Sequence, residues 1–347
     1  MVLLFGDPAP TFSIEGVSNP RYVFDTAAGR YLVLAFVPAG PEVARAVETL
    51  SRQRDAFNDK HACAFIVIVG KDKQRKKRAD LLPGIRFLFD QDGSVATLFG
   101  VQESGWFLID PALHVMTSVG PDKAATLVDR IPSLPPPNRH GGPEGIAPVL
   151  VTPRIFEQSF CDHLIALYRE TGGEPSGFMR EVDGVTKLMM NDQHKRRSDV
   201  LVEDETLQKQ VVARLTRRLV PQIEKAFNFK PTRIERYLVA RYDAETGGFF
   251  RPHRDNTTKG TAHRRFAVSI NLNSDYDGGD LRFPEFGDRT YRPPPGGACV
   301  FSCSVLHEAT AVTRGERFAF LPFLYDEDAA KVREENLQFL DPALLER

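Results

Sequence analysis

The stretch RIERYLVARYDAETGGFFRPHRDN, residues 233–256, joins a strand-like run, a glycine turn and the sequence His253-Arg254-Asp255. Residues two positions apart in a strand point to the same face, so His253 and Asp255 can present two ligands to one point. His307, on a later strand-like run, adds a second imidazole. Two histidines and one carboxylate leave adjacent coordination positions open, as non-haem Fe(II) sites require, whereas zinc sites are more often closed. The pattern therefore predicts an iron site.

Arg317 begins the apolar stretch RFAFLPFLY, residues 317–325. An unpaired charge in such a strand is costly, and the guanidinium suits a carboxylate such as the distal one of 2-oxoglutarate. The alternative is an internal salt bridge. By strand alternation Arg317 shares a face with Ala319, Leu321 and Phe323, and we assign this face to the interior of a barrel.

Short alternating runs separated by Gly, Pro and Asp continue to residue 325. They are RIERYLVARY (233–242), RRFAVSINLN (264–273), DLRFPEF (280–286), GACVFSCS (297–304) and RFAFLPFLY (317–325). Such a series favours an antiparallel sandwich or barrel. Residues 153–172 and 205–228 are predicted to form amphipathic helices outside it. One face of the second helix carries Leu207, Val211, Leu215, Leu219 and Ile223.

Three segments of this half closely resemble the prolyl 4-hydroxylase-like 2-oxoglutarate oxygenases. They are YDAETGGFFRPHRDN (242–256), SINLNSDYDGGDLRFPEF (269–286) and SCSVLHEATAVTRGERFAFLPFLYD (302–326). The resemblance implies a double-stranded β-helix (jelly roll) with flanking helices. It also implies His253, Asp255 and His307 as iron ligands, Arg317 as the anchor of 2-oxoglutarate, O₂ as second cosubstrate and ascorbate as a reductant.

Two further positions are candidates for binding the cosubstrate. Tyr242 matches a tyrosine that reaches the cosubstrate in the resembling family, the alternative being a structural core tyrosine. Asn271 falls where some relatives have a tyrosine that helps to bind the distal carboxylate, so Arg317 has a different helper or none. Related halogenases replace the carboxylate ligand by a small residue, and Asp255 therefore favours hydroxylation.

The stretch IPSLPPPNRHGGPEGIAP, residues 131–148, has six prolines and three glycines, which exclude a long helix or a paired strand. It separates two patterns of hydrophobicity. The predicted division is an N-terminal domain over 1–133, a linker over 134–148, an oxygenase domain over 149–330 and a C-terminal tail over 331–347.

The N-terminal half alternates strand-like and helical runs in the order β-α-β-α-β-β-α, which predicts an α/β thioredoxin-like fold. Segments such as YLVLAFVPAGPEVARAVETL (31–50) and WFLIDPALHVMTSV (106–119) resemble the peroxiredoxins over about residues 1–131. Their reactive cysteine lies in the first turn of the helix after a strand, where the helix N-terminus lowers its pKa. The corresponding stretch, Pro38 to Val47, has no cysteine, and Cys63 lies in an apolar strand. We therefore expect a redox-inactive scaffold that serves dimerisation, giving a homodimer, or substrate docking.

The amino-acid composition indicates which kinds of partner the chain does not require. The chain of 347 residues has a formal net charge of −1 and 42% hydrophobic residues. This balance predicts no obligatory nucleic-acid or membrane partner. The N-terminus is too short in apolar residues for a signal peptide, and four cysteines are no disulfide framework, so a cytoplasmic protein is expected.

The prediction is an Fe(II)- and 2-oxoglutarate-dependent dioxygenase that hydroxylates a C–H bond, with a prolyl residue of a peptide or protein as substrate and succinate as coproduct. One alternative is the hydroxylation of a free amino acid or other small molecule. Another is a non-catalytic binding or sensing protein. Residues 173–195 are interpreted as a lid, and Arg196 and Arg197 as facing an anionic substrate, the alternative for both arginines being ordinary surface.

Overall fold

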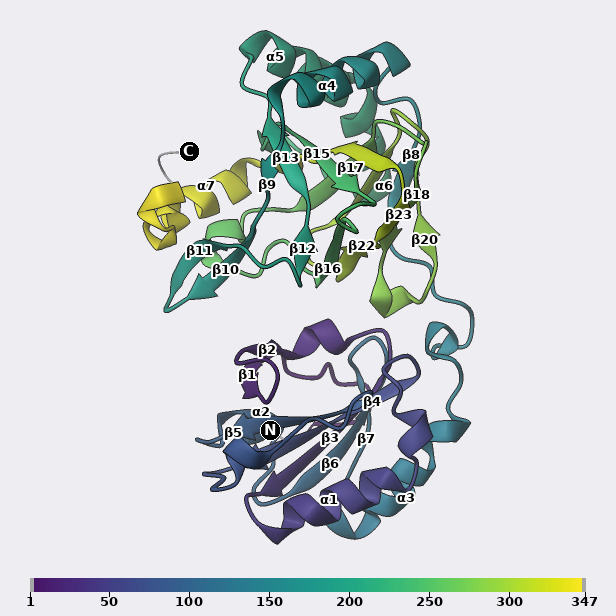
Figure 1. The fold of residues 1–347 in the computed structure, drawn as a ribbon, viewed down its shortest axis with the longest axis vertical. Helices are drawn as coiled ribbons and strands as arrows, with labels where there is room; N and C mark the ends of the chain where they lie inside the picture. Colours follow the sequence, from purple (N-terminus) through teal and green to yellow (C-terminus); the bar gives the residue numbers. More distant parts are fainter. Residues whose placement is uncertain (1–2, 345–347) are drawn as a thin grey trace. The chain divides into compact units, whose positions relative to one another are not determined.

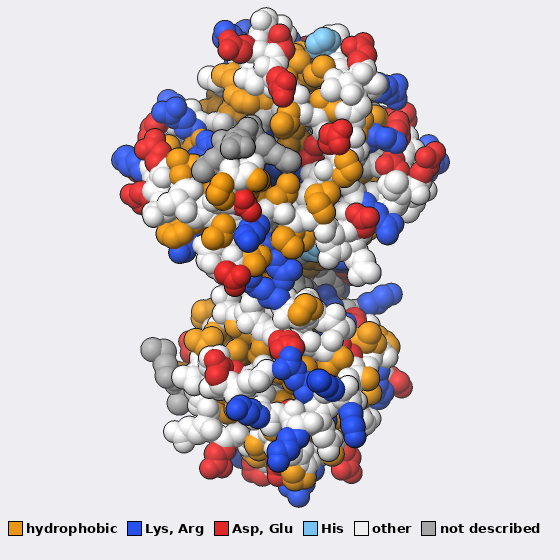
Figure 2. Space-filling model, turned by 60° about the vertical axis from the view of Figure 1, so that its left-hand side comes forward, with side chains coloured by type: hydrophobic (Ala, Val, Ile, Leu, Met, Phe, Trp, Pro, Cys, Tyr) orange, Lys and Arg blue, Asp and Glu red, His pale blue; other side chains and the backbone are white. Residues whose placement is uncertain are grey.

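The computed structural model describes residues 3–344 and contains two compact units (Figure 1). One comprises residues 1–146 with 284–288, and the other comprises residues 147–283 with 289–347. The boundary at 146–147 falls inside the predicted linker. Among the described residues, no helix has the length and apolar character needed to cross a membrane. Figure 2 shows acidic and basic side chains interspersed on one face, in keeping with the small net charge.

The N-terminal unit is built on one seven-stranded sheet. Its order is β2 (Tyr22–Val23), β1 (Ser13–Gly16), β5 (Ile85–Asp90), β4 (Ala62–Val69), β3 (Tyr31–Pro38), β6 (Gly105–Ile109) and β7 (Val115–Val119). The strands β3, β4 and β5 are parallel, and β6 and β7 are antiparallel to their neighbours. Strands β3 and β4 are buried on both faces, which explains their nearly continuous apolar sequence.

Helices cover this sheet as a thioredoxin-like fold requires. Helices α1 (Pro41–Ser51) and α3 (Ala124–Asp129) pack together against one face (Figure 1). The short helix α2 (Ser94–Leu98) follows β5. The predicted thioredoxin-like fold is confirmed. The strands β1 and β2, at one end of the sheet, were not predicted from the sequence pattern.

The C-terminal unit is built on two large antiparallel sheets, and two two-stranded sheets accompany them. The larger has the order β14 (Arg233–Glu235), β25 (Phe323–Tyr325), β17 (Phe266–Asn271), β24 (Glu316–Phe320), β15 (Leu238–Asp243), β13 (Ser198–Leu201) and β9 (Glu174–Pro175). On it, β21 (Ala298–Ser302) pairs with β17 and with β8 (Leu150–Thr152). The smaller has the order β12 (Lys195–Arg196), β16 (Phe249–His253), β22 (His307–Ala309), β19 (Leu281–Arg282) and β20 (Thr290–Tyr291). This arrangement is the predicted jelly roll.

Strand alternation separates two cores in this unit. Leu238, Ala240 and Tyr242 of β15 form an inner cluster together with Ala309 of β22. Val239 points the other way, into the core beneath the helices. Those helices are α4 (Gln158–Thr171), α5 (Glu205–Arg214) and α6 (Val220–Phe227). The inner cluster thus marks the space between the two sheets.

The predicted second helix is interrupted. A π-helical turn, Leu215–Leu219, joins α5 to α6. Pro221 has no N–H, and its ring would clash with the carbonyl group four residues earlier in an α-helix, which accounts for the wider turn. The predicted apolar face is confirmed, because all five of its residues are buried.

Three segments differ from prediction. DLRFPEF, residues 280–286, is a strand only over Leu281–Arg282 and a 3-10 turn over Pro284–Phe286, since Pro284 cannot donate to a ladder. The predicted domain end at 330 falls inside α7 (Glu327–Asn336). The tail continues as 3-10 turns, and its residues 345–347 lie outside the described chain.

Candidate active site

The three predicted metal ligands come together on the smaller sheet. His253 of β16 and His307 of β22 are register partners, and Asp255 follows β16 by two residues. Nε2 of His253 lies 3.5 Å from Oδ1 of Asp255, and Nε2 of His307 lies 3.3 Å from Oδ2. All three ligand atoms lie within 4.8 Å of one another. Two imidazoles and one carboxylate at this spacing fit a single metal ion.

The surroundings hold each ligand in its metal-binding form. Nδ1 of His253 donates to the carbonyl of Arg251 at 2.7 Å, and Nδ1 of His307 donates to that of Val305 at 3.0 Å. These bonds leave both Nε2 atoms free to bind a metal. Burial, and then the charge of His307, lower the pKa of His253 to about 4. Burial opposes ionisation of Asp255, but the two histidines outweigh it and hold its pKa well below the usual range.

Arg317 is 2% exposed and has no carboxylate partner among the described residues. Its Nη2 donates to Oγ of Ser269 at 2.8 Å and to Oδ1 of Asn271 at 3.1 Å. Its neighbour across the strands is Tyr242, whose ring centroid lies 5.4 Å from Cζ of Arg317. A buried guanidinium that contacts only neutral groups leaves its charge available to a carboxylate ligand.

Asn271 lies beside Arg317 and accepts hydrogen bonds from it. Its amide nitrogen donates to the hydroxyl of Tyr276 and to the carbonyl of Pro293, each at 2.9 Å. Neither Ser269 nor Tyr276 was a predicted site residue. Ser269 shares the inward phase of Asn271 and was open to prediction, whereas Tyr276 lies in a loop without periodicity.

An aromatic wall continues from the metal ligands. The ring of Phe250 stacks on that of His253 at 3.5 Å, and the ring of His194 lies 5.5 Å from Phe250. Phe178 packs on His194 at 4.4 Å. Phe178 begins a hairpin of β10 (Phe178–Val182) and β11 (Val185–Met189), the centre of the segment interpreted as a lid. The hairpin therefore lies beside the metal ligands.

The two arginines predicted to face a substrate differ. Arg196 is exposed and donates to the backbone carbonyls of Asp192 and Thr246. The side chain of Arg197 is 6% exposed and pairs with Asp199 at 2.6 Å. Only Arg197 points into the unit.

Two protein families match this chain, one in each half. Residues 237–325 match the 2OG-Fe(II) oxygenase superfamily. Residues 5–121 match the AhpC/TSA family. The recognition made from the sequence motifs is thus confirmed in both halves, and the oxygenase match contains all three candidate ligands and Arg317.

Proteins with a similar sequence include several that are named hydroxylases. A PKHD-type hydroxylase of Shewanella frigidimarina is 38% identical over 78 residues, which cover 22% of this chain and 34% of that protein. One from Maricaulis maris is 34% identical over 94 residues, which cover 26% of this chain and 42% of that protein. The chain therefore spans less than half the length of these two relatives.

Solved structures with a similar arrangement include prolyl hydroxylases. A Pseudomonas putida prolyl-4-hydroxylase is 18% identical with a TM-score of 0.41, over 52% of this chain and 94% of that chain. A viral collagen prolyl hydroxylase from Paramecium bursaria Chlorella virus-1 is 15% identical with a TM-score of 0.39, over 51% of this chain and 96% of that chain.

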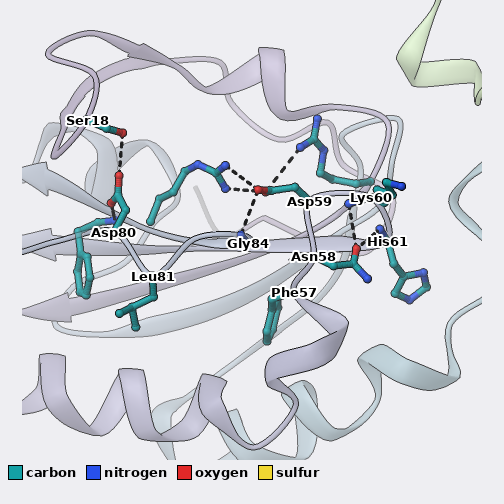
Figure 3. Close-up of polar contacts among 12 residues, drawn as sticks. Ser18, Phe57, Asn58, Asp59, Lys60, His61, Asp80, Leu81 and Gly84 are labelled. Carbon is teal, nitrogen blue, oxygen red and sulfur yellow. Dashed lines mark hydrogen bonds and ion pairs between the residues drawn. The ribbon is translucent and has the colours of Figure 1, made fainter.

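The N-terminal unit contains a buried cysteine and polar clusters with structural roles. Cys63 is 1% exposed, and burial raises the pKa of its thiol to about 11. The carboxylate of Asp59 accepts hydrogen bonds from Arg86 at 2.6 and 2.8 Å and from the amide of Gly84 at 3.1 Å (Figure 3). Asp80 likewise binds Ser18, at 2.8 Å. These carboxylates fix loops, and Cys63 is a core residue.

Proposed function

We propose that this protein is an Fe(II)- and 2-oxoglutarate-dependent dioxygenase that hydroxylates a C–H bond, with a prolyl residue of a peptide or protein as its substrate. One observation carries the proposal. The candidate metal ligands and the carboxylate-free guanidinium of Arg317 border the same space between the two sheets. His307 shares the face of Ala309, and Arg317 contacts Tyr242, so both strands reach the inner cluster.

Each residue has a separate task in this proposal. His253, Asp255 and His307 hold Fe(II), which supplies the centre where O₂ is activated. Arg317 binds the distal carboxylate of 2-oxoglutarate, while Ser269 and Asn271 orient its guanidinium. The aromatic wall excludes water from the metal ligands.

We also assign Tyr242 a role in binding 2-oxoglutarate. Its side chain is 3% exposed and faces the inner cluster. We assign ascorbate the role of an external reductant that keeps the iron in its ferrous state. The prolyl substrate rests on the resemblance of the three motif segments, and the names of the relatives support hydroxylation.

The test is an anaerobic titration of the full chain with Fe(II) and 2-oxoglutarate. A weak visible charge-transfer band is expected, followed in air by succinate formation with prolyl peptides. His253→Ala should abolish both, whereas His163→Ala, at an exposed histidine of α4, should preserve them. A wild-type chain with no band and no 2-oxoglutarate consumption would refute the proposal.

The alternatives are separated by the same experiment. Turnover with free amino acids but not with prolyl peptides would identify a small-molecule hydroxylase. A binding or sensing protein should keep its partner in the His253→Ala variant, whereas an enzyme should lose all product.

We assign the N-terminal unit the role of a redox-inactive scaffold that supports a homodimer or docks the substrate. The absence of cysteine from 38–47 and the burial of Cys63 support this. Sedimentation of the full chain should give a dimer, and hydrogen peroxide with a thiol reductant should not be consumed. The four cysteines are free, which suits the reducing cytoplasm, where we place the protein.

A further inference from the structure

Lys195 is a buried lysine close to the candidate metal ligands. It is 5% exposed, and its ammonium group donates to Oγ of Ser176 at 2.7 Å and to the carbonyl of Gly177 at 2.5 Å. Both acceptors are neutral. Its Nζ also lies 4.8 Å from the ring centroid of Phe250, the ring that stacks on His253. Among the described residues, this lysine has no carboxylate within ion-pair distance, and the ring of Phe250 lies between it and a metal ligand.

A second cation shares the same hydroxyl. Nη2 of Arg197 donates to Oγ of Ser176 at 3.1 Å and to Oδ2 of Asp199 at 2.6 Å. Within the described part of the chain, the buried Nε of Arg197 and the buried Oδ1 of Asp199 have no hydrogen-bond partner. Asp199 therefore forms its ion pair with Arg197, and no described carboxylate lies within ion-pair distance of Lys195.

A third cation is held by an unusual backbone conformation. Arg236, between β14 and β15, has φ of +69°, a value that costs a non-glycine residue energy and persists where the surroundings enforce it. Its guanidinium stacks on the ring of Phe323 at 4.8 Å, and its buried Nε has no hydrogen-bond partner among residues 3–344. Burial, and then the charge of Arg264, lower the pKa of Arg236 to about 10.

Arg264 itself is satisfied, because it forms two hydrogen bonds with Glu235 at 2.6 and 2.9 Å. The interior cationic set is defined as Lys195, Arg197 and Arg236. Among the described residues, its only ion pair within 4 Å is the one between Arg197 and Asp199. Asp255 and Glu235 act on the set from further away, and they are engaged by the two histidines and by Arg264. Burial lowers the pKa of Lys195 well below its usual value, and the charges of Arg197 and Arg236 add to this effect. Such a surplus is costly unless a ligand supplies negative charge.

The set is distinct from the group assigned to 2-oxoglutarate. Strand β15 pairs with β13 on one side and with β24 on the other. Arg197 directly precedes β13, whereas Arg317 lies on β24, so Tyr242 of β15 stands between the two arginines. A carboxylate at the interior cationic set is therefore a different group from the one that Arg317 binds.

We propose that the interior cationic set binds a carboxylate of the primary substrate and so selects substrates that carry a negative charge near the hydroxylated carbon. This inference rests on the proposed function and narrows it. The carboxylate is either that of a free or C-terminal amino acid or that of an acidic side chain beside the target residue. In both cases the carboxylate of the ligand supplies the negative charge that balances the interior cationic set.

The test compares acids with their neutral amides as ligands of the full chain loaded anaerobically with Fe(II) and 2-oxoglutarate. One pair is L-proline and L-prolinamide. The other is the amidated peptides Gly-Pro-Asp and Gly-Pro-Asn, which differ only in the acidic side chain. Calorimetry should show that at least one acid binds at least about tenfold more tightly than its amide. A difference of this size is typical of one charge-assisted contact. The pair that shows the preference identifies the source of the carboxylate.

Variants connect the preference to these residues. Lys195→Met and Arg236→Gln should each remove most of the preference for the acid over the amide, and Lys195→Arg should retain this preference. Arg196→Met is the matched control, because it removes the neighbouring but exposed charge of the same strand and should leave the preference unchanged. Melting curves of all variants check folding, and Lys195→Arg serves as the folded comparison if Lys195→Met unfolds.

Two results overturn the inference. One is a wild-type chain that binds no acid more tightly than its amide. The other is a preference that persists in folded Lys195→Met or Arg236→Gln. Turnover of 2-oxoglutarate is recorded separately, so that a failure of the proposed function is distinguished from a failure of this inference.

Discussion

Nη2 and Nε of Arg317 both donate to Oδ1 of Asn271, at 3.1 and 3.3 Å. The amide nitrogen of Asn271 is meanwhile fixed by the hydroxyl of Tyr276. Asn271 therefore presents its acceptor to the guanidinium and its donor to the tyrosine. Where some relatives use a tyrosine at this position, the present chain has an asparagine that orients the arginine, with a tyrosine hydroxyl one hydrogen bond away.

Replacing this orienting contact should weaken 2-oxoglutarate binding without removing the charge. Asn271→Leu leaves the guanidinium without its acceptor, which costs about 1–2 kcal/mol, or about five- to thirtyfold in Kd. Arg317→Met should raise Kd by about a hundredfold or more, because a charge-assisted pair is lost. Arg314→Met, at an exposed ion pair with Asp277, should leave Kd unchanged. Calorimetry with 2-oxoglutarate measures all three, and an unaltered Kd in Arg317→Met would contradict the assignment.

Metal binding should stabilise the fold by mass action. Mn(II) at a hundred times its Kd adds about 2.7 kcal/mol to the free energy of unfolding, which raises Tm. Asp255→Ala should abolish this rise, and EDTA should reverse it in the wild type. Asp162→Ala, at an exposed carboxylate of α4, is the control. A rise in Tm that survives in Asp255→Ala would show that the metal binds elsewhere.

Gly279 permits the close approach of Arg317. Its φ is +68°, and a Cβ there would lie 2.8 Å from Cγ2 of Val312 and 3.2 Å from Cδ of Arg317. Gly279→Ala should therefore both lower stability, by about 1–3 kcal/mol, and weaken 2-oxoglutarate binding. Gly247→Ala is a matched control, since Gly247 has φ of +63° and open space around it. Equal effects of the two substitutions on 2-oxoglutarate binding would argue against the steric contact with Arg317.

His194 should make the metal-free protein less stable in mild acid. Burial, and then the charge of Arg251, lower its pKa to about 4. Between this value and about 6.5, the unfolded chain binds a proton that the folded chain does not, so stability falls as pH falls through this window. The loss attributable to His194 at pH 5 is about 2 kcal/mol. Urea unfolding at pH 7.5 and 5 should show a smaller loss in His194→Phe, and an identical loss in both proteins would contradict this.

Local periodicity explains which parts of the fold were predictable. Strands β3 and β4 are buried on both faces and therefore carry continuous apolar runs. The prediction of one strand over DLRFPEF was wrong, because Pro284 lies inside this apolar run and the strand ends at Arg282. The strands β1 and β2 at one end of the sheet are short and half exposed, so their sequence carries little periodicity.

The sequence by itself determined the candidate metal ligands, the inward phase of Arg317 and the absence of a reactive cysteine, because residue type and two-residue alternation are local properties. Only the tertiary structure decided which neighbours these residues have. It placed Ser269 against Arg317 and Tyr276 against Asn271, and it separated buried Arg197 from exposed Arg196. It also buried Lys195 with no ion-paired carboxylate among the described residues. Those contacts depend on the register between strands distant in sequence, and a shift of one residue would turn each side chain to the other face.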